Sequence, residues 1–191
     1  MILSDVHLEH CLKEGEIIVD PLADGAIQPA SIDLRLDRHF LVFDRDKNVI
    51  IDPREPLDDK MREITIGHDS PFILHPGAFA LGLVYEKTGV DAQHVGMLDG
   101  KSSVGRLGVL VHATAGYLDP GNCLKMTLEL HNVANMPVLL YYMMPIAQMV
   151  FFELTTQCRN PYTAKSGGKY VGDMKPKASQ MWRNFTKDSD A

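Results

Sequence analysis

The chain has 191 residues, the size of a single domain, and 45% of its residues are hydrophobic. Charged residues make up 23% and no low-complexity tract is present, which excludes disordered, collagen-like and coiled-coil proteins. The formal net charge of -6 gives no general attraction for a polyanion, so we expect no nucleic-acid partner. Local binding of a small anion remains open.

The three cysteines, Cys11, Cys123 and Cys158, are odd in number and far apart. They provide neither a disulfide framework nor paired zinc knuckles, and a reducing compartment suits them best. Acidic residues interrupt the N-terminal segment, so no secretory signal is expected. Prolines and asparagines interrupt the uncharged stretch 132–152, so no membrane span is expected there either. We expect a cytoplasmic protein with no membrane partner.

Residues 4–14 are predicted to form a short amphipathic helix, with Ser4 as its N-cap and Gly15 just past its end. Residues 32–36 alternate between apolar and charged side chains, as in a half-buried strand. Further short strands are predicted at residues 39–43, 48–51, 64–66 and 72–75. Short strands at this spacing favour a sandwich or barrel over alternating helices and strands.

Residues 109–117 and 125–133 are two strand-like runs on either side of the turn-forming sequence Asp119-Pro120-Gly121-Asn122. This arrangement predicts a hairpin. In the second run the apolar side chains fall on alternate positions, which places Glu129 on the opposite, polar face.

After residue 154 the composition shifts to Lys, Ser, Gly and Asn, which predicts a mobile C-terminal tail. We expect one domain, with a β-barrel core over residues 1–154 and a tail over residues 155–191 that closes over a ligand. The glycine-containing segment 167–170, together with Tyr162, suggests such a flap.

Two catalytic motifs are present only in part. His7-Leu8-Glu9 matches the first half of the zinc deaminase signature, but the P-C-x-x-C half is missing, so solvated helix side chains explain it better. A nucleophilic triad of Ser102, His112 and Asp119 lacks the G-x-S-x-G turn, and His112 is interpreted as an ordinary sheet histidine.

Residues 100–107 resemble a P-loop only in part, because Arg106 stands in place of the phosphate-binding lysine and Leu107 in place of the magnesium-binding hydroxyl. What remains is a glycine-rich entry into a helical turn that carries two adjacent hydroxyls and two cations. These groups can donate several hydrogen bonds to phosphate oxygens. A capped surface turn is the simpler interpretation of these residues alone.

Four ordered blocks, residues 27–36, 100–108, 114–121 and 127–130, are followed by Ile146-Ala147-Gln148 and a Tyr162…Lys169-Tyr170 tail. Together they cover nearly the whole chain and resemble the dCTP deaminase family of the trimeric dUTPase superfamily. The resemblance implies a mainly β fold, with a distorted β-barrel or jelly-roll protomer of the dUTPase type and a short N-terminal helix. It also implies a homotrimer whose active sites lie between subunits.

The resemblance implies deamination of dCTP without a zinc-bound water. Glu129 would act as general base and acid, and Arg106 would stabilise the tetrahedral centre. Ser102 and the carbonyl of Ala115 would hold the attacking water, and Asp119 would meet the deoxyribose.

The same resemblance implies a set of nucleotide-binding residues: Lys101, Ser103, Val104, Gly105, Thr127, Leu128, Gln148, Tyr162 and Lys169. Magnesium would be carried by the triphosphate rather than by protein ligands, and no zinc is expected. The implied small-molecule partners are dCTP and dUTP, with dTTP as a candidate inhibitor.

Family members with histidine after Thr-Ala are typically plain deaminases, whereas Thr114-Ala115-Gly116 resembles the bifunctional, dUMP-forming type. Residues 115–119 also resemble the dUTPase motif A-G-x-[IL]-D, whose aspartate helps to position water at the α-phosphorus. We expect conversion of dCTP into dUMP, ammonia and pyrophosphate. The alternatives are a dCTP deaminase that releases dUTP, a dUTPase that no longer deaminates, and a non-catalytic nucleotide sensor.

The chain departs from the family pattern at three places. Leu124 stands where relatives usually have glycine, and Tyr142-Met143-Met144 replaces a Pro-Gly-Met turn, so a positive φ there would strain a residue with a β-carbon. Asp173 falls where a tail glutamine commonly contacts the γ-phosphate. A carboxylate there would repel the phosphate unless magnesium or Lys175 intervenes.

Overall fold

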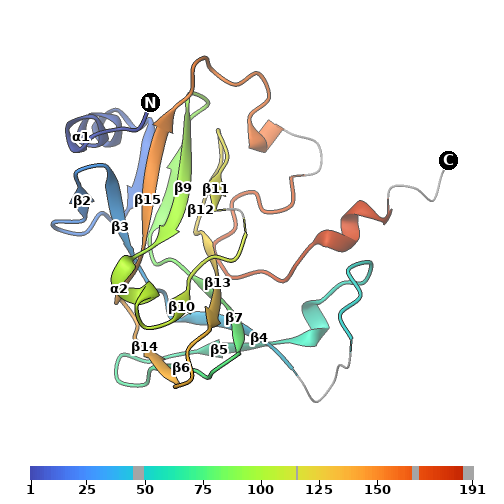
Figure 1. Ribbon diagram of the computed structural model, residues 1–191. Coiled ribbons are helices and arrows are strands. Elements are labelled where there is room, and N and C mark those ends of the chain that lie inside the picture. Colours follow the sequence, from blue (N-terminus) through green and yellow to red (C-terminus); the bar gives the residue numbers. More distant parts are fainter. Residues whose placement is uncertain (45–49, 115, 165–167, 187–191) are drawn as a thin grey trace.

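The structure is a computed structural model that describes residues 1–44, 50–114, 116–164 and 168–186 (Figure 1). Two α-helices lie in these ranges, α1 (Asp5–Glu14) and the one-turn α2 (Ser102–Gly105). The strands are β1 (Ile17–Asp20), β2 (Ile27–Gln28), β3 (Ser31–Arg35), β4 (His39–Phe43), β5 (Met61–Thr65), β6 (Phe72–Leu74), β7 (Phe79–Leu83), β8 (Lys87–Val90), β9 (His94–Gly100), β10 (Val109–Leu110), β11 (Tyr117–Leu118), β12 (Cys123–Leu124), β13 (Thr127–Asn132), β14 (Val138–Leu140) and β15 (Pro145–Glu153). The predicted mainly β fold with a short N-terminal helix is confirmed.

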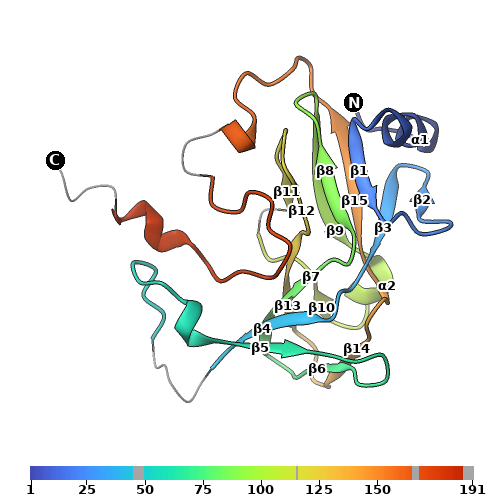
Figure 2. The same ribbon diagram turned by 180° about the vertical axis from the view of Figure 1, so that it is seen from behind.

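The strands pair in antiparallel fashion into four sheets (Figures 1 and 2). The two large sheets have the orders β10-β13-β7-β4-β5 and β11-β9-β15-β3-β2, and the small ones are β1-β8-β12 and β14-β6. Within the described ranges none of these sheets closes on itself, so the predicted distorted barrel is an assembly of open sheets around a shared core.

Helix α1 forms where the sequence predicts it. Ser4 precedes it in an extended conformation, and Gly15 ends it in the left-handed conformation with φ 76°. Leu8 and Cys11, three residues apart, are buried against the sheets, while the other face of the helix is exposed. The helix therefore covers one end of the core.

The period-2 patterns in the sequence become two strands, β3 and β13, that each pack one face into the core. Ile32 and Leu34 of β3 have no exposed surface, and neither have Leu128 and Leu130 of β13. Intervening residues such as Glu129 stay half-buried on the other face. Alternation therefore fixes both the packing face and the polar face of each strand.

The predicted hairpin around residues 119–122 is confirmed at the ends of its two runs far from the turn, where Val109 pairs with Asn132 and Leu110 with His131, and is wrong next to the turn. β11 pairs with β9, β12 pairs with β8, and β13 pairs with β7 and β10. The turn itself is present, because Gly121 has φ 78° and its N–H donates to the carbonyls of Val90 and Asp91 at 3.1 and 2.9 Å. The turn-forming residues 119–122 therefore determine where the chain reverses. Contacts with distant strands determine the partners of β11 and β12.

Two departures from the family pattern have different structural outcomes. Leu124 lies in β12 with a buried side chain, and its φ is not positive. Met143 does adopt a positive φ of 68°, between the hydrogen bonds of its N–H to Leu36 O (2.9 Å) and of Leu36 N–H to Met144 O (2.9 Å). The strained turn is therefore kept in place by its pairing with the end of β3.

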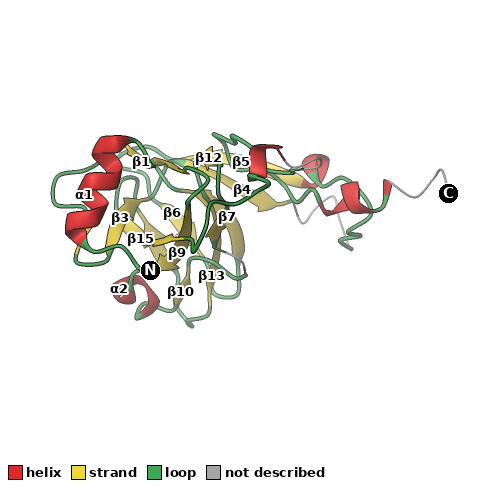
Figure 3. Cartoon of the chain, turned by 90° about the horizontal axis from the view of Figure 1, so that it is seen from above, coloured by secondary structure: helices red, strands yellow, loops and turns green. Residues whose placement is uncertain are grey.

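The β4–β5 connection and the C-terminal segment extend together away from the sheets (Figure 3). The strand predicted at residues 48–51 is wrong at Ile50 and Ile51, which are exposed and not in a strand, and residues 48 and 49 lie outside the described ranges. The C-terminal segment contains two 3-10 turns, Tyr162–Ala164 and Met181–Asn184. Its mobility stays a prediction. No helix in the described ranges is long and apolar enough to cross a membrane.

Gly116 has no room for a side chain, which gives a test of the fold. An added Cβ would lie 2.5 Å from the carbonyl oxygen of Leu98, so Gly116→Ala must displace backbone. We expect the free energy of unfolding to fall by about 1–3 kcal/mol, measured by urea denaturation. Gly67→Ala is the matched control, because its Cβ would meet nothing closer than Ser70 Cβ at 4.0 Å. Equal stability of the two variants would contradict the packing.

Candidate active site

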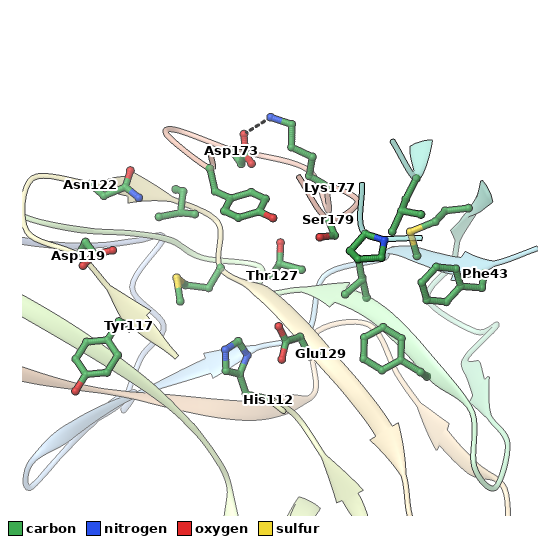
Figure 4. A pocket seen from close by; sticks show the side chains of 18 of the residues that line it. Phe43, His112, Tyr117, Asp119, Asn122, Thr127, Glu129, Asp173, Lys177 and Ser179 are labelled. Atoms are coloured by element: carbon green, nitrogen blue, oxygen red, sulfur yellow. Dashed lines mark hydrogen bonds and ion pairs between the residues drawn. The ribbon is translucent and has the colours of Figure 1, made fainter. Parts of the chain in front are cut away.

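A pocket of about 610 Å³ lies between β13, the turn after β11, the β4–β5 region and the C-terminal segment (Figure 4). One part of its wall is apolar and comes mainly from the β4–β5 region and β7. The polar lining residues are His112, Asp119, Asn122, Thr127, Glu129, Asp173, Lys177 and Ser179, with the hydroxyls of Tyr117, Tyr162 and Tyr170. A flat apolar group and a polar chain can therefore be bound together here.

The Glu129 carboxylate is held in the pocket by the segment that precedes β11. Its Oε2 accepts the backbone N–H groups of Ala113 at 3.0 Å and Thr114 at 3.1 Å, and the Thr114 hydroxyl lies 3.3 Å from the same oxygen. The Glu129 N–H donates to Val111 O at 3.1 Å, which ties the strand to the same segment. Among the described residues Oε1 meets only the Thr114 hydroxyl, at 3.4 Å, so it keeps most of its capacity to accept a proton or a hydrogen bond from them.

His112 lies beside Glu129 in the pocket wall (Figure 4). Both of its ring nitrogens are buried, and neither has a hydrogen-bond partner among the described residues. Buried polar nitrogens are normally paired, so this site can supply a donor or an acceptor to a bound ligand. The sequence-based interpretation of His112 as an ordinary sheet histidine missed this, and no local pattern distinguishes the two cases.

Asp173 lines the pocket, and its charge is paired. Its Oδ1 lies 2.9 Å from Lys177 Nζ, and its backbone carbonyl accepts the Lys125 N–H at 2.8 Å. Lys177, rather than the expected Lys175, is the cation that offsets this carboxylate.

Several predicted site residues do meet in the pocket. Glu129, Thr127, Asp119 and Tyr162 all line it. Leu128 does not present its side chain, which is fully buried in the core, so only its backbone is available to a ligand.

The predicted flap is hydrogen-bonded to the side chain of Tyr162. The Tyr162 hydroxyl accepts the backbone N–H groups of Lys169 at 3.2 Å and Tyr170 at 3.4 Å. These bonds hold the chain after residues 165–167, which lie outside the described ranges, next to the pocket. Lys169 itself is not among the lining residues, whereas Tyr170 is.

A second group of predicted residues gathers elsewhere, around α2. Lys101 precedes this helix and pairs with Asp33 at 2.6 Å, and Gln148 Oε1 lies 3.4 Å from the Ser31 hydroxyl. Gln148 faces Asp33 across the β15–β3 pair, so these side chains share one surface. None of them lines the pocket, and α2 and the C-terminal segment lie on opposite sides of the molecule (Figures 1 and 2).

The exposed residues of this group are available for binding. Ser102, Ser103 and Arg106 are exposed, Val104 anchors the turn in the core, and Gly105 ends it. Within the described ranges the Arg106 guanidinium has no ion-pair or hydrogen-bond partner. Ala115, predicted to hold the attacking water, lies outside the described residues.

Two rejected patterns can be checked against the structure. Ser102 does not line the pocket that contains His112 and Asp119, so the three do not form a triad within one chain. His7 and Glu9 are exposed on α1, as solvated side chains are expected to be.

Comparison with known proteins agrees with the motifs. A family model described as dCTP deaminase-like matches residues 2–154. A protein named dCTP deaminase, dUMP-forming, from Corynebacterium jeikeium is 44% identical over 186 residues, which cover 97% of this chain and 99% of that protein. One of the same name from Nocardia farcinica is 44% identical over 192 residues and covers 100% of this chain and 96% of that protein.

Among solved structures, 2'-deoxycytidine 5'-triphosphate deaminase from Agrobacterium tumefaciens matches with a TM-score of 0.60 at 20% identity. The match covers 78% of this chain and 48% of that one, so it supports the fold alone. The fold and the site define a mainly β protein with a half-buried glutamate in the wall of a pocket of about 610 Å³. The chain belongs to the dCTP deaminase-like family.

Proposed function

We propose that this chain is a dUMP-forming dCTP deaminase that converts dCTP and two waters into dUMP, ammonia and pyrophosphate. The observation that carries the proposal is the Glu129 carboxylate, oriented by the N–H groups of Ala113 and Thr114 at one wall of a 610 Å³ pocket. Family membership and the Thr114-Ala115-Gly116 sequence support the dUMP-forming type. The cytoplasm, where nucleotides are made, is the proposed location.

Glu129 acts as general base and then as general acid. Its carboxylate takes a proton from the water that attacks C4 of the cytosine and returns a proton to the departing ammonia. The two backbone N–H groups fix Oε2, so Oε1 is the oxygen turned to the reacting water. Ser102 and the carbonyl of Ala115 hold that water, and Arg106 stabilises the charge on the tetrahedral centre.

The substrate is the magnesium complex of dCTP, in which the ion bridges phosphate oxygens and needs few protein ligands. Lys101, Ser103, Gln148, Tyr162 and Lys169 bind the triphosphate, with backbone contacts from Val104, Gly105 and Leu128 and a pocket contact from Thr127. The Asp173–Lys177 pair supports this assignment, because the lysine reduces the repulsion that a free carboxylate would exert. A nucleotide of the same shape, such as dTTP, would compete for the site.

Asp119 serves the second half of the reaction. It lies at the pocket edge after β11, close to Asn122, whose N–H donates to the Asp119 carbonyl at 3.1 Å. From this turn the carboxylate can contact the deoxyribose and orient the water that attacks the α-phosphorus. That attack breaks the α–β phosphoanhydride bond and releases pyrophosphate.

The active site is proposed to form between the subunits of a homotrimer. Glu129 and the α2 group belong to one reaction yet lie on separate surfaces of one chain, so a neighbouring α2 must complete the pocket. Exposed apolar side chains near α2 suit such an interface: Leu107, Leu110, Val133 and Met136. The unpartnered Arg106 guanidinium would then find its charge partner in the substrate.

Product analysis with dCTP and magnesium tests the reaction. We expect dUMP, ammonia and pyrophosphate in equal amounts, quantified by chromatography and coupled assays, without accumulation of dUTP. Accumulation of dUTP without pyrophosphate would make the protein a plain deaminase. Binding of dCTP with no ammonia release would favour a nucleotide sensor, and hydrolysis of dUTP alone would favour a dUTPase.

Glu129→Gln tests the proton shuttle. We expect ammonia release to fall by about 10²-fold or more, because the amide cannot accept the proton from water. Affinity for dCTP, measured by titration calorimetry, is expected to stay near the wild-type value, since one oxygen remains to accept the backbone N–H groups. Glu9→Gln on the exposed face of α1 is the control and should leave both values unchanged. Ammonia release near the wild-type rate in Glu129→Gln would remove Glu129 from this role.

Complementation tests the shared site. Glu129→Gln and Arg106→Ala are each expected to be inactive, but trimers that contain both chains can form a site with an intact Glu129 and an intact Arg106. Equal co-expression is expected to restore about a quarter of the wild-type activity. Native mass spectrometry would verify that mixed trimers form. Mixed trimers without activity would contradict a site built from two chains.

A further inference from the structure

Cys11, Glu16 and His94 come together beside α1, and none of them lines the pocket. They come from the last turn of α1, the residue before β1 and the first residue of β9. One ligand atom of each, the thiol sulfur, a carboxylate oxygen and a ring nitrogen, lies within 4.8 Å of the other two. The three are a thiolate, carboxylate and imidazole set of the kind that binds zinc.

The distance between the Cys11 sulfur and the His94 ring nitrogen is close to that in a metal centre. A tetrahedral zinc ion with ordinary bond lengths holds a sulfur and a nitrogen ligand about 3.6 Å apart. Cys11 Sγ and His94 Nε2 are 4.0 Å apart, so a contraction of about 0.4 Å would bring them to that spacing. Small side-chain rotations supply such a shift. The Glu16 N–H donates a hydrogen bond to the Cys11 carbonyl at 2.9 Å, which holds these two residues close together.

The imidazole ring of His94 is held in the orientation that is usual for a metal ligand. Its Nδ1 lies 2.9 Å from Asp91 Oδ1, which also accepts the backbone N–H groups of Gln93 and His94 at 2.8 and 3.0 Å. Because a carboxylate only accepts, the proton sits on Nδ1 and the lone pair of Nε2 is directed toward Cys11. A carboxylate that fixes the ring of a histidine in this way is the usual outer partner in zinc sites.

The local charge favours a cation. The Glu16, Asp91 and Glu153 carboxylates all act on Cys11, and among the described residues no lysine or arginine forms an ion pair with Glu16. A nucleophilic Cys-His-Asp triad would share part of this geometry. Cys11 is only 3% exposed. A thiol that no substrate can reach does not act as a nucleophile.

We propose that Cys11, Glu16 and His94 form a structural zinc site, with water as the fourth ligand. The ion would join α1 and β1 to the start of β9. It would also steady Asp91, whose backbone carbonyl accepts the N–H of Gly121 in the turn that carries Asp119. The site lies outside the pocket, so this zinc takes no part in the deamination and the proposal does not depend on the proposed reaction.

Zinc binding by the full chain, purified without a polyhistidine tag and stripped with a chelator, is the test. We expect one zinc per chain by elemental analysis after dialysis against zinc chloride, and a higher midpoint of thermal unfolding with zinc than without it. Cys11→Ala and His94→Asn should lose both effects. Asp91→Asn should weaken zinc binding by about 10–100-fold. Cys158→Ala and His10→Asn, on the same chain but outside the cluster, are the matched controls.

Cobalt substitution identifies the ligands. The cobalt form should show a thiolate-to-metal charge-transfer band and the visible bands of a four-coordinate ion, absent in Cys11→Ala and present in Cys158→Ala. Circular dichroism would verify that Cys11→Ala is folded, which is expected because alanine suits a small buried position. Zinc binding by folded Cys11→Ala equal to that of the wild type, or no retained zinc in the wild type, would overturn the proposal.

Discussion

The hydrogen bonds from Ala113 and Thr114 to the Glu129 carboxylate are the interaction on which the candidate site depends. They join two segments that belong to different parts of the fold, the chain before β11 and the central strand β13. Alternation along β13 makes them possible, because the burial of Leu128 and Leu130 turns Glu129 to the opposite face. One strand therefore builds the core and presents the carboxylate.

In the proposed mechanism, a single chain presents the catalytic groups on two separate surfaces. The pocket gathers the glutamate, an aspartate, a histidine and tail residues, while the serines and Arg106 of α2 lie on another surface. A site shared between two chains would account for the exposed cationic and apolar side chains around α2.

The Cys11, Glu16 and His94 cluster illustrates a different relation between sequence and function. The three residues are separated by up to 83 positions, and the spacing matches no zinc motif. Only the packing of α1 against the start of β9 brings them together. His7 and Glu9, which do match part of a motif, are exposed, and neither belongs to a cluster of candidate metal ligands among the described residues.

The sequence by itself determined α1, the alternating strands β3 and β13, the turn at residues 119–122 and, through its ordered motifs, the family. These features depend on local periodicity, capping and turn chemistry, which neighbouring residues carry. Only the tertiary structure decided the partners of β11 and β12, the place of Asp173 and Lys177 in the pocket wall, and the ring of His112, which has no hydrogen-bond partner among the described residues. These depend on contacts between residues distant in the chain, and no local pattern specifies which segments will meet.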